Sequence, residues 1–285
     1  MSPTRSRERR TPERGRRALT SASALALLAM SATACDAEQW KRAGFPEPVT
    51  EQADRILRLW QGSWVAALAV GIVVWGLIIW AMLFHRKRSE ELPPQVRYNL
   101  PIEMLYTAVP FIIIGVLFYF TARDENYIQK QRETGKADVT VKVTAFQWSW
   151  QFDYMQAAGT TPETVKPLSP PVSIVGTPTS PDAPGGTGQG QKPVLVLPVG
   201  KVVRFNLHTN DVIHSFWVPA FLYKEDVMPG YNNSFEVTPT KTGAYEGRCA
   251  ELCGVDHSRM LFQVKIVTQA EYDAFIKSKQ SGGSQ

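Results

Sequence analysis

The sequence predicts a mixed membrane and all-β fold, in which an N-terminal two-helix transmembrane hairpin precedes a Greek-key β-sandwich. Two long apolar runs occupy the first half of the chain. A polarity period of two residues, typical of strands, begins near Asp138. Short apolar segments separated by Gly and Pro then continue to residue 267, a spacing that favours a sandwich over a helical domain.

Residues 1–34 have the layout of a bacterial signal peptide. An Arg-rich part is followed by an apolar part from Ala18 to Met30 and by the cleavage signature Ala32-Thr33-Ala34. Cys35 follows directly, as in lipoprotein signals. The sequence leaves two interpretations of Cys35 open: a lipid anchor, or a free surface thiol after ordinary cleavage.

The net charge of +5 does not indicate a nucleic-acid partner. Seven Arg and two Glu lie within 1–34, and the remainder of the 285-residue chain is balanced. Because the positive excess lies in a segment that is expected to be removed, we predict no nucleic-acid binding.

The two apolar runs predict transmembrane helices at 59–84 and 101–122, after an extracytoplasmic linker at 35–58. The first run carries no charge and exceeds the ~20 residues that cross a bilayer. The loop at 85–100 is rich in Arg and Lys, so the positive-inside rule makes it cytoplasmic. Both ends of the hairpin then lie outside, which places the β domain on the extracytoplasmic side of a bacterial cell membrane.

The β domain is expected at 137–270. Val139, Val141 and Val143 alternate with polar residues, and the alternation continues with aromatic side chains as far as Tyr154. A Pro/Gly-rich insertion at 156–193 predicts a loop with little fixed structure. A C-terminal helix and tail are predicted at 271–285. Further strands are expected at 194–197, 201–207, 215–219, 221–223, 234–238, 244–248 and 261–267.

One short stretch carries most of the chemistry: Cys249, Glu251, Cys253, His257 and Met260 lie within twelve residues. Thiolate and thioether are soft ligands, and their combination with imidazole suits copper better than magnesium or calcium. Two cysteines in an extracytoplasmic domain also suit a disulfide. Zinc accepts Cys and His but has little use for the methionine, and a mononuclear blue-copper site would leave one cysteine unused.

A second imidazole from another segment is needed to surround a metal. His214 lies thirty-five residues upstream of Cys249, in Asp211-Val212-Ile213-His214-Ser215-Phe216. His208 is the alternative. Two bridging thiolates, two imidazoles, a thioether and a main-chain carbonyl would serve two copper ions almost equally, so we rank a dinuclear centre first.

The motif C-x-E-x-C-x3-H-x2-M with an upstream D-V-x-H-S-F resembles subunit II of the haem-copper cytochrome c oxidases. The resemblance implies a cupredoxin-like sandwich and a dinuclear copper centre, called CuA. It also implies that the Glu251 side chain reaches a magnesium ion shared with subunit I. The matching copper ligands are His214, Cys249, Glu251 through its main-chain carbonyl, Cys253, His257 and Met260.

The resemblance gives roles to two further residues. Trp148, in Gln147-Trp148-Ser149-Trp150, matches the tryptophan through which this family receives electrons, although core packing is the alternative. Glu103 matches a glutamate at the cytoplasmic mouth of a proton channel in subunit I. An interfacial acid without such a role is the alternative for Glu103.

Together these features predict an oxidoreductase component. The protein would accept electrons from cytochrome c, or from a c-type cytochrome domain, and pass them to haem in subunit I. There oxygen would be reduced to water with proton pumping. The partners would be subunit I, the other oxidase subunits and the bilayer. The alternative is a membrane-anchored mononuclear copper carrier or binding protein that is not part of an oxidase.

Overall fold

The structure is a computed structural model that describes residues 37–87, 91, 95–130, 136–156, 165–178 and 190–282. The predicted signal peptide and Cys35 lie outside the described residues. The chain divides into two units, 1–44 and 45–285. In the first unit the described part holds the short helix α2 (Ala37–Lys41).

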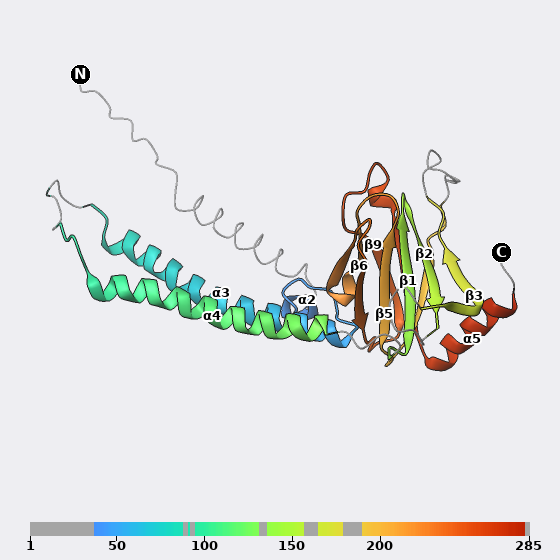
Figure 1. Cartoon of the computed structure of the whole chain (residues 1–285). Helices are drawn as coiled ribbons and strands as arrows, with labels where there is room; N and C mark the ends of the chain where they lie inside the picture. The colour runs from blue at the N-terminus through green and yellow to red at the C-terminus, as the bar shows by residue number, and fades with distance from the viewer. Residues whose placement is uncertain are drawn as a thin grey trace, which may run out of the picture. The chain divides into compact units, whose positions relative to one another are not determined.

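Two long helices, α3 (Glu51–Phe84) and α4 (Leu100–Gln129), run side by side (Figure 1). Both are long and apolar enough to cross a membrane. Helix α3 begins eight residues before the predicted 59, within the predicted linker, because the Thr50 hydroxyl accepts the Ala53 N–H at 3.1 Å and caps it. Helix α4 also continues beyond the predicted 122, where Asp124 pairs with Arg55 of α3 at 3.1 Å.

The residues immediately before α3 are joined to the rest of the β domain by main-chain hydrogen bonds. The Val49 N–H donates to the Ala220 carbonyl at 3.2 Å, and the Thr240 N–H donates to the Val49 carbonyl at 2.8 Å. Val49 and Thr50 are buried there. The predicted linker is therefore in part a packed connection.

The β domain is a sandwich of two five-stranded sheets, ordered β3-β2-β1-β5-β8 and β4-β10-β9-β6-β7. The pairs β1/β5 and β4/β10 are parallel, and the remaining pairs are antiparallel. Two helices fused to such a sandwich confirm the predicted fold class. The strands are β1 (Val139–Phe146), β2 (Ser149–Met155), β3 (Pro167–Val175), β4 (Val194–Pro198), β5 (Val203–Thr209), β6 (His214–Val218), β7 (Tyr223–Val227), β8 (Asn233–Val237), β9 (Gly243–Cys249) and β10 (Leu261–Val267).

The aromatic alternation does not form one continuous strand. Strand β1 ends at Phe146 and β2 begins at Ser149, so Trp148 lies in the turn between them. Trp150, Phe152 and Tyr154 are fully buried, whereas Trp148 is only half-buried. The turn therefore separates Trp148 from the core face that the simple alternation assigned to it.

Two other expectations were wrong in part. The strand predicted at 221–223 is replaced by a 3-10 turn, η1 (Pro219–Phe221), and β7 begins only at Tyr223. Within the predicted loop at 156–193, residues 167–175 form β3, which pairs with β2 at the sheet edge. Three prolines in β3 are compatible with this position because an edge strand needs fewer N–H donors.

The C-terminal helix α5 (Gln269–Ser281) packs against β3 and β4 (Figure 1). It begins at a capping box in which Thr268 and Glu271 satisfy each other's backbone N–H groups. The rings of Tyr272 and Phe275 lie 6.2 and 5.7 Å from the ring of Tyr154. The helix therefore closes the end of the core at which β10 finishes, opposite to the loop between β9 and β10.

We expect Gly247→Ala to destabilise the sandwich by more than about 1–3 kcal/mol, the usual cost of overpacking a core. A Cβ atom at Gly247 would lie 2.1 Å from the Phe262 ring. That ring is buried and packs against Phe216 and Trp150, so it has no room to move. Denaturant unfolding measures the loss. Gly76→Ala is the matched control, because its Cβ would meet nothing within 4 Å.

Candidate metal centre

Adjacent strands bring the predicted copper ligands to one end of one sheet. His214 is the first residue of β6, Cys249 is the last residue of β9, and Met260 directly precedes β10. The loop between β9 and β10 supplies Cys253 and His257, the latter in the short turn η2 (His257–Arg259). Sequence positions up to forty-six residues apart therefore meet at one site.

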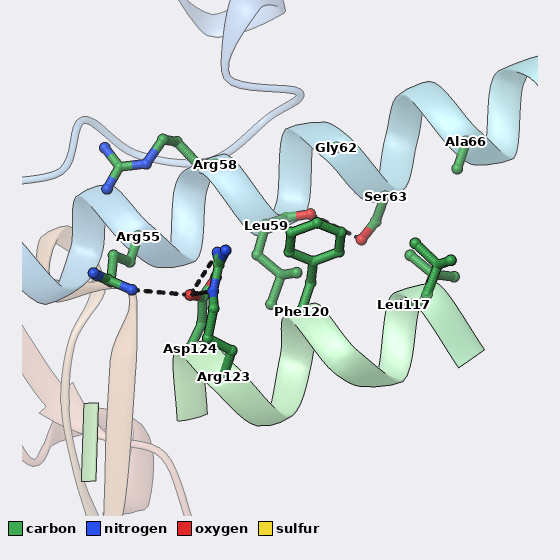
Figure 2. A pocket seen from close by; sticks show the side chains of 11 residues that line it. Arg55, Arg58, Leu59, Gly62, Ser63, Ala66, Leu117, Phe120, Arg123 and Asp124 are labelled. Atoms are coloured by element: carbon green, nitrogen blue, oxygen red, sulfur yellow. Dashed lines mark hydrogen bonds and ion pairs between the residues drawn. The ribbon is translucent and has the colours of Figure 1, made fainter. Parts of the chain in front are cut away.

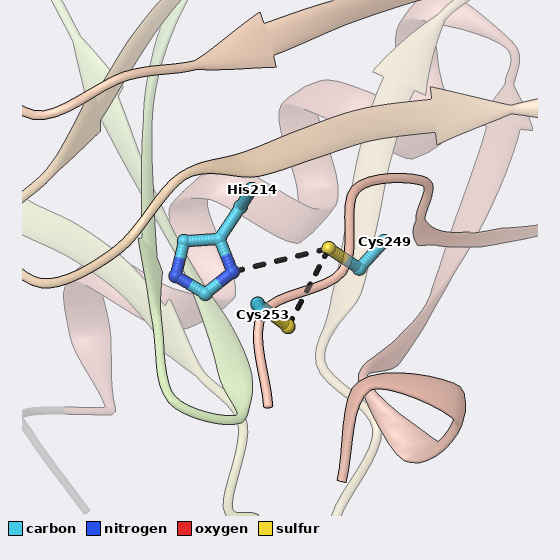
Figure 3. A group of neighbouring side chains, drawn as sticks. All are labelled: His214, Cys249 and Cys253. Carbon is cyan, nitrogen blue, oxygen red and sulfur yellow. Dashed lines mark hydrogen bonds between the residues drawn. The ribbon is translucent and has the colours of Figure 1, made fainter. Parts of the chain in front are cut away.

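The sulfur atoms of Cys249 and Cys253 lie next to each other, and the His214 ring lies beside that of Cys249 (Figure 3). The two sulfur atoms lie 3.8 Å apart and both cysteines are free. The Sγ of Cys249 is 3.8 Å from Nδ1 of His214 and 3.2 Å from the main-chain oxygen of Glu251. The Sγ of Cys253 is 3.5 Å from Nδ1 of His257 and 3.8 Å from Sδ of Met260. The other four predicted donors thus surround the sulfur pair.

The site is largely shielded from solvent. His214, Cys249, Cys253 and Met260 are buried, and His257 is half-buried. Beneath them the Trp150 indole donates a hydrogen bond to the Met260 carbonyl at 3.3 Å. This bond fixes the backbone of one donor against the aromatic core.

His208, the alternative imidazole, does not take part. Its Nε2 lies 2.9 Å from the Asn210 side-chain oxygen. The group of side chains able to hold a metal among the described residues consists of His214, Cys249 and Cys253. The structure therefore favours His214 over His208.

Asp211 is a part of the site that the sequence reasoning missed. Its Oδ1 lies 2.7 Å from Nε2 of His214, which leaves Nδ1 facing the sulfur of Cys249. Carboxylates commonly orient metal-binding imidazoles in this way. The other carboxylate oxygen accepts the Gln147 N–H at 2.7 Å. The Asp-x2-His spacing was the feature of the sequence that could have indicated this contact.

The electrostatics of the site favour loss of a thiol proton. Proximity to Cys253 lowers the pKa of the Cys249 thiol, with His214 adding to the shift. The same proximity, together with burial, raises the pKa of Cys253, so the two thiols titrate as a pair. Burial alone would lower the pKa of His214, but its contacts with Cys249 and Asp211 outweigh that effect and raise it.

Trp148 contacts the backbone of the donor loop. Its indole N–H donates to the Cys253 carbonyl at 3.0 Å, and the Gln147 side-chain amide donates to the same oxygen at 2.8 Å. Gly254 has a φ of +125°, and a Cβ there would lie 2.9 Å from the indole. Glycine at 254 therefore permits both the backbone turn and the close approach of Trp148.

Two predicted residues lie outside the sulfur cluster. The Glu251 side chain is exposed, and only its main-chain oxygen faces Cys249. Glu103 lies in the first turn of α4, where its carboxylate accepts the Asn99 N–H at 2.9 Å. Glu103 thus stabilises the start of α4, whatever further role it has.

The donor chemistry fits copper. Two thiols, two imidazoles and a thioether are soft or borderline ligands, which hard cations such as magnesium and calcium bind poorly. The carboxylate behind His214 supplies the usual support for a metal-binding imidazole. The site is therefore a copper-centre candidate.

The comparisons with known proteins agree with this assignment. The family model described as the periplasmic domain of cytochrome c oxidase subunit II matches residues 139–267. A protein of Streptomyces avermitilis described as "Probable cytochrome c oxidase subunit 2" is 51% identical over 292 residues, covering 94% of this chain and 89% of the relative. The cytochrome c oxidase subunit 2 of Mycobacterium bovis is 38% identical over 314 residues, covering 95% of this chain and 84% of the relative.

Among solved structures, the chain is similar to the periplasmic domain of subunit II of cytochrome oxidase from Bradyrhizobium japonicum. The identity is 30%, the match covers 52% of this chain and 98% of that one, and the TM-score is 0.41. The family assignment rests on the sequence relatives. Their identity and coverage extend beyond the β domain into the helical hairpin. The chain belongs to the cytochrome c oxidase subunit II family, as a membrane protein with an extracytoplasmic copper domain and a component of a haem-copper oxidase.

Proposed function

We propose that this protein receives single electrons from a c-type cytochrome at a dinuclear copper centre and delivers them to haem in subunit I. The observation that carries the proposal is the convergence of two imidazoles, a thioether and a main-chain carbonyl on two sulfur atoms 3.8 Å apart. Family membership supports the oxidase as the setting.

The proposed ligand roles follow the arrangement of the donors. Cys249 and Cys253 would be shared by the two copper ions, because their sulfur atoms lie 3.8 Å apart and each faces a different imidazole. His214 and His257 would be terminal ligands. Bound copper would supply one-electron redox chemistry. The chain holds the donors in a buried arrangement and orients His214 through Asp211.

Trp148 is proposed as the point of electron input. It is half-buried, and its indole N–H contacts the carbonyl of Cys253, which places an extended π-system between solvent and a ligand residue. We also propose that the exposed Glu251 side chain holds a magnesium ion together with subunit I. A carboxylate is a suitable hard ligand for that ion, and its exposure leaves it accessible to a partner.

Metal analysis of the purified full-length protein tests the central proposal. We expect two copper ions per chain and an EPR hyperfine pattern from one unpaired electron shared by two equivalent copper nuclei. A mononuclear carrier would give one copper and a single-nucleus pattern. Zinc, or a Cys249–Cys253 disulfide in place of copper, would contradict the proposal.

We further propose that Glu103 helps to supply protons to subunit I from the cytoplasmic side. Glu103→Gln should lower turnover and proton pumping of the reconstituted oxidase, because the amide keeps the hydrogen bond to the Asn99 N–H but cannot carry a proton. Turnover and pumping are measured in vesicles with the copper spectrum as the folding control. Unchanged turnover would reduce Glu103 to its capping role.

A further inference from the structure

A cavity of about 540 Å³ lies between α3 and α4, within the ~300–1,000 Å³ typical of ligand pockets (Figure 2). The residues that line it change from charged to apolar along the helices. Arg55, Arg58, Arg123 and Asp124 line one end, and apolar side chains such as Leu59, Leu117 and Phe120 line the rest. The middle of the cavity is open at Gly62, where a Cβ would meet nothing within 4 Å.

The polar end of the cavity carries excess positive charge. Asp124 is buried and pairs with Arg55 at 3.1 Å and with Arg123 at 2.9 Å. Arg58 also lines the cavity and is exposed, and Figure 2 shows it outside this ion-paired group. Three guanidinium groups therefore line this end of the cavity beside one carboxylate, which leaves two positive charges for an anionic ligand.

The depth of these arginines matches a lipid headgroup. They lie at the ends of α3 and α4 that adjoin the extracytoplasmic domain, just outside the apolar run that begins at Leu59. Two residues after Arg58, the Trp60 ring stacks on Phe45 at 4.6 Å, and Trp60 also contacts Trp64. Tryptophan is typical of the membrane–water interface, so the guanidinium groups lie at the phosphate level of the outer leaflet.

We propose that this cavity is a binding site for an anionic phospholipid of the outer leaflet. The phosphate would be held by Arg58 and by the unpaired donors of Arg55 and Arg123, because guanidinium groups match phosphate oxygens in geometry and charge. An acyl chain would lie over Gly62, between Leu59, Leu117 and Phe120. The site concerns the membrane-embedded hairpin and is independent of the copper chemistry.

The test uses the intact purified oxidase containing this chain in non-ionic detergent. Dioleoylphosphatidylglycerol or dioleoylphosphatidylcholine is added at equal mole fraction, and native mass spectrometry counts the retained lipid. We expect preferential retention of phosphatidylglycerol. Arg58→Gln should weaken its binding about fivefold, the effect expected for one basic residue at a membrane surface. The binding of phosphatidylcholine should fall by less, because its choline group offsets the charge of its phosphate. Arg58→Lys keeps the charge but not the planar fork of donors, so it should retain part of the binding.

Two further variants separate the headgroup from the acyl chain. Gly62→Leu fills the groove and should reduce retention of both lipids, with copper content unchanged as the folding control. Arg86→Gln, at the opposite end of α3, should change neither lipid. Equal retention of the two lipids by the unmodified protein would overturn the proposal. So would loss of subunit I on Gly62→Leu, because a protein helix would then occupy the groove.

Discussion

An oxidase in which Cys249 is replaced by serine is expected to contain no copper in this subunit and to take up no electrons from cytochrome c. The Cys249 sulfur is central to the site, since it contacts Cys253, His214 and the Glu251 carbonyl. Serine offers a hard oxygen that copper binds weakly. The loss of copper affinity should exceed the ~10–100-fold that is typical when a residue that hydrogen-bonds to a metal ligand is removed.

Copper content and electron uptake from reduced cytochrome c are the measurements for Cys249→Ser. Cys35→Ser is the matched control, because it removes the third cysteine of the chain and should leave both quantities unchanged. Full copper occupancy in Cys249→Ser would mean that the bridging role is wrong. A folding defect is recognised separately by unfolding of the β domain.

Trp148→Ala should slow electron uptake by more than about tenfold while the copper spectrum stays intact. A tenfold change corresponds to about 1.4 kcal/mol in the barrier. The reason is that the variant removes the half-buried ring next to the donor loop and leaves all six donors in place. Stopped-flow oxidation of cytochrome c measures the rate.

Trp217→Phe is the control for Trp148→Ala. Trp217 is another half-buried indole of the same domain, and it stacks with Arg248 away from the sulfur pair. Its replacement should not change electron uptake. Simultaneous loss of rate and copper signal in Trp148→Ala would assign Trp148 to folding, through its hydrogen bond to the Cys253 carbonyl.

The donor set could be predicted because most of it is local. Four of its side chains and the carbonyl lie within twelve residues, and His214 has a recognisable context. Asp211 could not be assigned with the same ease. Its role depends on meeting His214 and the turn at Gln147 simultaneously, which only the folded chain reveals.

The differences in the fold have local physical causes. The turn at Gln147-Trp148 contains neither Gly nor Pro, so alternation of aromatic residues concealed it. The start of α3 and the end of α4 are polar and lie outside the apolar runs, and the Arg55–Asp124 pair joins these two helical extensions. Strand β3 lies in a Pro-rich segment, and its pairing with β2 overrides a composition that predicts a loop.

Strand β3 also affects how the domain behaves outside the cell. Free sheet edges recruit strands from other molecules, which is a common beginning of aggregation. Pro167, Pro170 and Pro171 lack N–H groups, and the Gln280 amide of α5 already donates to the Pro170 carbonyl at 3.3 Å. The β3 edge of this sheet therefore offers few hydrogen bonds to an incoming chain, so strand addition from another molecule is disfavoured at this edge.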